Sequence, residues 1–156
     1  MINKTNNGIT IIEILIAIAV ISIISSIVVL NLSKFRNEQA LKNTTIDIVS
    51  LLNKAKQNTL SSINSNSYGV HFETDKITLF VAPTYSSGTN TNEVSIFSTT
   101  VKIPTSGGIN VGGGSDVIFE RLTGETIGGT IIVQQKSNVS RQKTITISKT
   151  GIISSN

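Results

Sequence analysis

Few side chains in this sequence could carry catalysis or bind a metal. Its 156 residues include no cysteine and one histidine, His71, which disfavours disulfide frameworks, cysteine-based metal sites and histidine-based catalytic triads. His71 lies in an alternating segment, where we expect a surface residue or a satisfied strand residue rather than a ligand. Asp116, Glu120 and Glu125 could approach one another, but their spacing does not fix a general acid/base pair. We therefore predict no catalytic residue, no metal site and no bound cofactor.

Residues 105–116 hold five of the twelve glycines and could be mistaken for a phosphate-binding loop. No Gly-Lys-Ser/Thr sequence and no helix signal follow them, so the lysine and the helix dipole that would hold a phosphate are missing. We predict a flexible surface loop here.

The most unusual acid is Glu13, because it lies inside an apolar stretch. Residues 9–32 contain ten isoleucines and no other charge, and the twenty residues from Ile14 to Ser33 are all uncharged. A helix of twenty residues measures about 30 Å, enough to cross a bilayer core, so we predict a transmembrane helix over residues 9–33. With 14% charged and 4% aromatic residues, the chain is a poor candidate for an ordinary soluble enzyme.

Two other interpretations of the apolar stretch stay open. A secretory signal peptide would be removed after the stretch, but it would have a shorter apolar region ending in small residues, and Glu13 would be out of place in it. A plain single-pass anchor would keep the stretch without assembling. Basic residues flank both ends, so the positive-inside rule does not choose an orientation.

The segment before the apolar stretch is short and basic, and it ends at Gly8-Ile9-Thr10. With Glu13 at the fifth position from Ile9, this arrangement resembles the type IV pilins and the type II secretion pseudopilins, which are cut after a glycine and carry glutamate at the fifth mature position. The resemblance implies a leader peptide over residues 1–8, cut by a prepilin peptidase between Gly8 and Ile9. It also implies N-methylation of Ile9 and a role for Glu13 in filament assembly. The family usually has Phe or Met at the first mature position, so Ile9 departs from the commonest pattern.

Elementary electrostatics gives Glu13 a function of its own. A carboxylate in lipid is costly, so an intramembrane acid is a functional hypothesis by default. Cleavage after Gly8 would create an ammonium group at Ile9, and pairing of that group with Glu13 would offset the desolvation of both charges. In the resembled family the ammonium belongs to a neighbouring subunit, and the pair sets the register of the filament. Pairing within one chain is the alternative.

The helical pattern continues beyond the apolar stretch. No Pro or Gly occurs between Ile9 and Ser67, so we predict one helix of about 55 residues whose amphipathic second half, residues 34–66, packs on the rest of the chain. The predicted buried stripe consists of Leu41, Thr45, Ile48, Leu52, Ala55, Thr59 and Ile63, widened by Ile46, Val49 and Leu51.

Residues 67–156 change to alternating apolar residues and turn residues, which predicts a small β-rich globular domain. The expected strands are residues 68–72 and 77–81, paired as a hairpin, followed by 94–103, 117–119, 130–134, 144–148 and 152–153. An antiparallel sheet of these strands, packed on the amphipathic half of the helix, gives an α+β fold.

The order of these segments resembles the H-type minor pseudopilin and the related minor pilin domain. Phe119, Gly124 and Gly151 occupy the characteristic Phe, Gly and terminal Gly positions of that domain. The resemblance implies a minor filament subunit.

The end of the chain is basic, since no acid follows Glu125 whereas Lys136, Arg141, Lys143 and Lys149 do. Strand-edge lysines that discourage edge pairing are one explanation, and contact with DNA phosphates is the other. By strand parity, we expect Arg141, Lys143 and Lys149 to face alike. The net charge of +4 does not by itself indicate nucleic-acid binding.

These features together predict a pilin-like subunit of a type IV pilus or type II secretion pseudopilus, not an enzyme. The resemblance implies four partners: a prepilin peptidase, other pilin or pseudopilin subunits, an inner-membrane assembly platform and the lipid bilayer. It also implies an extracytoplasmic C-terminal domain. Two alternatives stay open, a minor pilin that binds DNA during uptake and an anchored extracytoplasmic binding domain that never polymerises.

Overall fold

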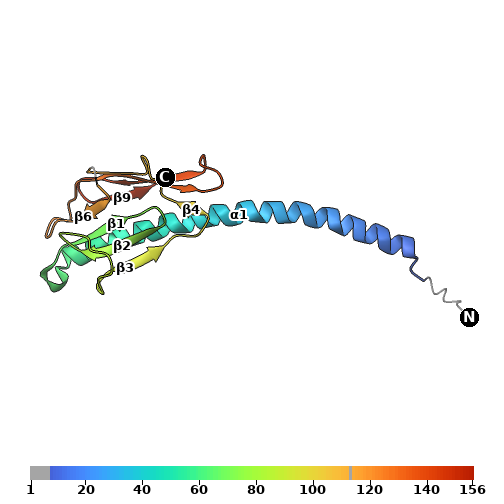
Figure 1. The fold of residues 1–156 in the computed structure, drawn as a ribbon, viewed down its shortest axis with the longest axis horizontal. Helices are drawn as coiled ribbons and strands as arrows, with labels where there is room; N and C mark the ends of the chain where they lie inside the picture. Colours follow the sequence, from blue (N-terminus) through green and yellow to red (C-terminus); the bar gives the residue numbers. More distant parts are fainter. Residues whose placement is uncertain (1–7, 113) are drawn as a thin grey trace, which may run out of the picture. The chain divides into compact units, whose positions relative to one another are not determined.

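The computed structural model describes residues 8–112 and 114–156, with the side chains of residues 27–31 outside the description. The described residues form one long helix, a short 3-10 helix and nine strands (Figure 1), and this architecture confirms the predicted α+β class. The elements are α1 (Ile11–Leu60), η1 (Ile63–Ser65), β1 (Tyr68–Phe72), β2 (Lys76–Val81), β3 (Glu93–Ile96), β4 (Val101–Lys102), β5 (Ile109–Val111), β6 (Asp116–Ile118), β7 (Gly129–Gln135), β8 (Gln142–Ile147) and β9 (Ile153–Ser155).

Helix α1 ends at Leu60, earlier than the predicted end near residue 66. Ser62, Asn64 and Ser65 adopt positive φ angles of 48°, 51° and 58°. Such angles place a residue outside the right-handed helical region, so the long helix cannot continue through them. The segment after Leu60 therefore forms η1 instead of the last turn of the predicted helix.

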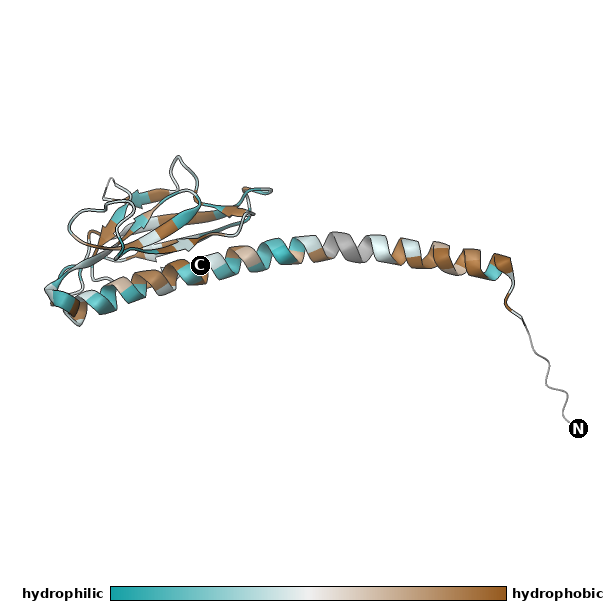
Figure 2. Cartoon of the chain, turned by 60° about the horizontal axis from the view of Figure 1, so that its bottom comes forward, coloured by the Kyte–Doolittle hydropathy of each residue, from teal (hydrophilic) through white to brown (hydrophobic). Residues whose placement is uncertain are grey.

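The chain divides into two compact units, residues 1–36 and 37–156. In the first unit, the described apolar side chains of α1 are exposed, and Figure 2 shows them as hydrophobic residues near the N-terminal end of the helix. Across the described part of the chain, no helix is both long enough and apolar enough to cross a membrane. Of the predicted leader peptide, residues 1–7 lie outside the described residues, as do the side chains of residues 27–31 within the predicted transmembrane helix.

The second unit buries the predicted stripe of α1 against the strands. Most of the stripe is confirmed, because six of its seven main positions are buried, and Leu51 is buried beside them. Ile63 and Ile46 are exposed, so the prediction was wrong at these two positions: Ile63 falls in η1 beyond the end of α1, and Ile46 points away from the core. The buried stripe residues are Leu41, Thr45, Ile48, Leu52, Ala55 and Thr59.

The strands form two antiparallel sheets instead of the single sheet expected. One sheet has the order β3-β2-β1-β6, and the other has the order β4-β7-β8-β9 with β5 also paired to β7. The predicted hairpin is confirmed by the pairing of β1 with β2, in which Tyr68 lies opposite Val81. Apolar side chains from both sheets and from α1 make up one hydrophobic core cluster.

One strand prediction and one loop prediction were wrong. The expected strand 94–103 is split, because the chain turns after Ser98, where the Val101 N–H donates to the Ser98 carbonyl at 2.9 Å. As a result β3 pairs with β2 in the first sheet, and β4 pairs with β7 in the second. The glycine-rich stretch 105–116 is also not a simple loop, because β5 lies within it and pairs with β7.

Candidate functional site

The first residues of α1 hold the predicted assembly motif. The Glu13 N–H donates to Thr10 Oγ1 at 3.3 Å, and the Ile14 N–H donates to the Thr10 carbonyl at 3.3 Å. Thr10 therefore caps the helix, and Glu13 lies in the first turn, where the helix dipole favours a carboxylate. The Thr-x-x-Glu spacing is a known sign of a helix start and could have predicted this cap from the sequence.

Gly8 and Ile9, the predicted cleavage positions, are both exposed just before α1 begins. Apart from its two chain neighbours, no heavy atom of the described residues lies within 4 Å of the point where a Cβ on Gly8 would be placed. Gly8 is therefore not packed against the described part of the chain.

The following turns of α1 present apolar side chains in every direction. The hydroxyl groups of Ser22 and Ser26 bond back to the helix, donating to the carbonyls of Ile18 at 2.8 Å and Ser22 at 2.9 Å. An exposed apolar surface of this extent favours association with lipid or with other apolar helices. The exposed apolar residues are Ile9, Ile11, Ile12, Ile14, Leu15, Ile16, Ile18, Val20, Ile21, Ile23 and Ile24.

The only histidine takes part in a polar cluster beside β1. His71 Nδ1 lies 2.5 Å from Asp116 Oδ1, and the imidazole stacks on Tyr85 with ring centroids 3.8 Å apart. Glu73 Oε1 lies 3.9 Å from His71 Nε2 and 3.3 Å from Lys76 Nζ. These contacts confirm the expectation of a satisfied strand residue.

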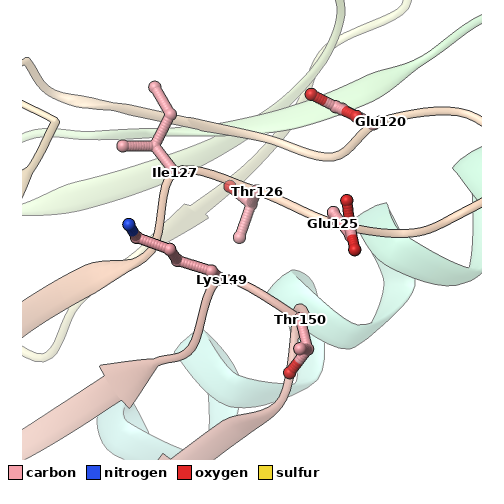
Figure 3. Close-up of a pocket in the computed structure, with 6 residues that line it drawn as sticks. All are labelled: Glu120, Glu125, Thr126, Ile127, Lys149 and Thr150. Atoms are coloured by element: carbon pink, nitrogen blue, oxygen red, sulfur yellow. The ribbon is translucent and has the colours of Figure 1, made fainter.

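The acidic residues Asp116, Glu120 and Glu125 do not form one cluster. Asp116 pairs with His71, whereas Glu120 and Glu125 lie in the loop between β6 and β7 and line a pocket with a volume of about 470 Å³. Figure 3 shows its six lining residues, which come from this loop and from the turn after β8: Glu120, Glu125, Thr126, Ile127, Lys149 and Thr150. The two segments are joined by the Thr126 N–H, which donates to the Lys149 carbonyl at 3.0 Å.

The lining of the pocket combines two acidic residues, one lysine, two threonines and the apolar side chain of Ile127. In the range that the structure describes, no three or more His, Asp or Glu side chains come close enough to hold a metal ion. In Figure 3 the Lys149 ammonium group lies on the side of Ile127, away from the carboxylates of Glu120 and Glu125.

The four basic residues proposed for DNA contact do not form one group. Arg141 Nη1 lies 3.2 Å from Glu38 Oε1 on α1, whereas Lys149 follows the far end of β8 and lines the pocket. Lys136 is exposed in the β7–β8 turn, and Lys143 is partly exposed opposite Val133. Lys149 lies beyond the end of β8, so the expectation that alternate strand residues face alike does not apply to it.

Comparison with known protein families decides which kind of protein this is. A family model described as "Competence system putative prepilin ComGE" matches residues 10–87, half of the chain. The chain belongs to this family. No curated protein and no solved structure matches the chain.

Membership of the ComGE family makes the chain a type IV pilin-like protein of the competence pilus, structural rather than catalytic. The matched residues include Glu13, all of α1 and the β1–β2 hairpin. The match supports the alternative interpretation, a minor pilin of DNA uptake, better than the main one, a subunit of a type IV pilus or type II secretion pseudopilus. The resemblance to the H-type minor pseudopilin, whose characteristic positions Phe119, Gly124 and Gly151 lie beyond the matched residues, stays a prediction.

Proposed function

We propose that this ComGE-family protein is cleaved between Gly8 and Ile9 and assembles into the competence pilus through the N-terminal part of α1. One observation carries the proposal: apolar side chains surround the helix from Ile11 to Ile24 and are exposed, while Glu13 occupies the first turn. Lipid would cover this surface before assembly, and the helices of other pilin-like subunits would cover it afterwards. The partners that follow are a prepilin peptidase, other subunits of the pilus and its inner-membrane assembly platform.

Cleavage after Gly8 would place a new ammonium group on Ile9, next to a helix that Thr10 caps. The ammonium of one subunit would then pair with Glu13 of a neighbour, because a charged group inside an apolar bundle is stabilised only when it is paired. Membership of this prepilin family supports a location at the membrane or in the pilus. Methylation of Ile9 would follow the same processing step.

Mass spectrometry of the protein purified from cells tests the processing step. The expected mature chain starts at Ile9, with or without one added methyl group, and Gly8→Ala should leave a larger share of uncut precursor. A purified protein that keeps Met1, or that starts beyond Leu30, would contradict the proposal.

Replacement of Glu13 tests the assembly step. Glu13→Leu should leave membrane insertion intact and reduce recovery in sheared pilus fractions, whereas Glu13→Asp keeps the charge and should retain part of the assembly. Equal recovery of Glu13→Leu and the parent would favour a plain membrane anchor. The abundance of the chain in purified filaments separates a minor from a major subunit, and we expect a minor one.

A second candidate function is DNA contact during uptake. It is favoured by the competence family together with the exposure of Lys136, Arg141 and Lys149. The engagement of Arg141 with Glu38 reduces the charge available at the β7–β8 turn.

A further inference from the structure

Strand β3 lies at the margin of its sheet, and only one of its two sides is paired. The sheet order β3-β2-β1-β6 places β2 on one side of β3 and no described strand on the other (Figure 1). An edge strand of this kind presents unpaired backbone N–H and C=O groups, with which another extended chain can pair. Natural proteins therefore protect most edges with lysine, proline, a bulge or a covering segment.

The unpaired backbone groups of β3 belong to Val94 and Ile96. Just beyond the end of β3, the Phe97 N–H donates to the Asp75 carbonyl at 2.8 Å. Hydrogen-bonded and non-bonded pairs alternate along an antiparallel ladder, so the backbone groups of Ser95 face β2, whereas those of Val94 and Ile96 face away. The open side of β3 thus offers two sets of N–H and C=O groups, about 6.6 Å apart.

The same two residues expose their side chains. Val94 is 52% exposed and Ile96 is 76% exposed, and they share one face of the sheet because they are two positions apart. Among the described strands, β3 alone carries large apolar side chains that are exposed. Its register with β2 is regular, without a bulge. At its two outward positions β3 therefore has no lysine, no proline and no bulge to discourage pairing.

Strand β3 is held in an extended form before any partner arrives. At its first residue, Glu93 Oε2 lies 2.5 Å from Lys54 Nζ on α1. Four ladder pairs with β2, from Glu93 opposite Leu79 to Ile96 opposite Lys76, fix the rest of the strand. The edge is preformed, so a partner strand does not have to order it, and this lowers the entropic cost of binding.

These features specify the occupant as an extended polypeptide segment. An extended backbone supplies a row of N–H and C=O groups that pair at the strand spacing of about 4.8 Å. Opposite Val94 and Ile96, β-branched or aromatic side chains would make the pairs that stabilise neighbouring strands. Opposite Ser95, a polar side chain fits, because that position faces the same side as the ion pair between Glu93 and Lys54. An alternating segment of about four residues meets these requirements.

We propose that β3 accepts such a segment from a different pilin-like subunit of the competence pilus, which adds one strand to the sheet. The N–H groups of Val94 and Ile96 donate to carbonyls of the added strand, and their carbonyls accept from its N–H groups. The partner is a different subunit and not a second copy, because the minor subunit expected here has other subunits as its neighbours. The inference rests on the proposed function for the presence of these neighbours, but it uses a surface separate from the apolar part of α1.

A proline at position 94 tests the backbone contact. Proline has no N–H, and the Val94 N–H points away from β2, so Val94→Pro keeps the ladder within the sheet. Val94→Thr keeps the N–H and the β-branched shape and is the matched control. Val94→Pro should lower recovery of the chain in sheared pilus fractions about fivefold or more relative to Val94→Thr. Equal recovery of two variants that both fold, as judged by circular dichroism, would overturn the proposal.

Hydrogen–deuterium exchange of the unaltered full chain gives a second test that needs no variant. In the purified chain in mild detergent, the Val94 and Ile96 amides should exchange quickly and the Ser95 amide slowly. In sheared pili, exchange at Val94 and Ile96 should slow about tenfold or more, whereas the Gly88 amide in an exposed loop should keep its rate. Unchanged exchange at Val94 and Ile96 would overturn the proposal.

The outcomes separate the β3 contact from the helix contact of the proposed function. If Glu13→Leu lowers recovery in pili and Val94→Pro does not, the β3 contact is wrong and the proposed function stands. A chain that is absent from sheared pili would overturn both. Slow exchange at Val94 in the concentrated purified chain, without other subunits, would show pairing between copies and would overturn the choice of partner.

Discussion

The buried hydroxyl of Thr59 joins the last turn of α1 to the first residue of β1. Thr59 Oγ1 donates to the Ala55 carbonyl at 2.9 Å and accepts a hydrogen bond from the Tyr68 N–H at 2.9 Å. Thr59 is fully buried, so water cannot replace either bond. The direction of the chain from helix to sheet is thus fixed by a side chain and not by a backbone turn alone.

Thr59→Val should lower the free energy of unfolding by about 1–3 kcal/mol, because the Tyr68 N–H would stay buried without a partner. Thermal unfolding followed by circular dichroism would show a lower midpoint, by roughly 2–4 °C per kcal/mol for a domain of this size. Thr59→Ser keeps the hydroxyl and is the control. A Thr59→Val protein as stable as the parent would show that this bond contributes nothing.

Gly151→Ala should be far more damaging than Gly88→Ala. Both glycines have positive φ angles, 73° and 79°, which cost any other residue about 1–2 kcal/mol. A Cβ at Gly88 would meet nothing within 4 Å, whereas one at Gly151 would collide with the Gly124 carbonyl oxygen. We expect the collision to add about 1–3 kcal/mol of destabilisation, measured by the same unfolding experiment. Equal effects of the two changes would contradict the packing described at Gly151.

Leu52→Ala and Ile46→Ala separate the buried face of α1 from its exposed face. Leu52 is fully buried in the core, so its truncation should cost about 2–5 kcal/mol. Ile46 is exposed, so its truncation should change stability by less than about 0.5 kcal/mol. A larger loss at Ile46 than at Leu52 would contradict the packing of the helix on the sheets.

DNA contact can be measured through its salt dependence. If Lys136, Arg141, Lys143 and Lys149 all contact phosphates, the logarithmic salt slope on duplex DNA should be about −3.6, and replacement of Arg141 and Lys143 by Gln should reduce it to about −1.8. Lys54→Gln, at a residue paired with Glu93, is the control. A full chain that does not retard DNA at low salt would remove the DNA proposal and leave the subunit proposal untouched.

Local patterns predicted the elements that depend on neighbouring residues. The spacing of Leu41, Ile48 and Leu52 indicated the buried face of α1, and the alternation in residues 68–81 indicated the β1–β2 hairpin. Both elements follow from periods of 3.6 and 2, which the sequence displays directly.

The remaining features depend on contacts between distant segments, which periodicity does not encode. Residues 94–103 were predicted as one strand, although they are shared between two sheets. The pocket that Glu120 and Lys149 line was missed for the same reason: these residues are brought together by the pairing of Thr126 with Lys149, not by their spacing. The sequence allowed Asp116 to approach Glu120 and Glu125, but Asp116 pairs with His71 instead.

The contact between Lys56 and Gly151 has a consequence for the order in which the chain folds. Lys56 Nζ donates to the Gly151 carbonyl at 3.0 Å across 95 residues, and Gly124 packs against the same point. The Lys56 ammonium group has no partner at Gly151 until nearly the whole polypeptide has left the ribosome. Contacts between such distant residues form late and slow folding, because a long loop must close first. The nascent chain therefore exposes its apolar N-terminal segment well before its C-terminal domain can close.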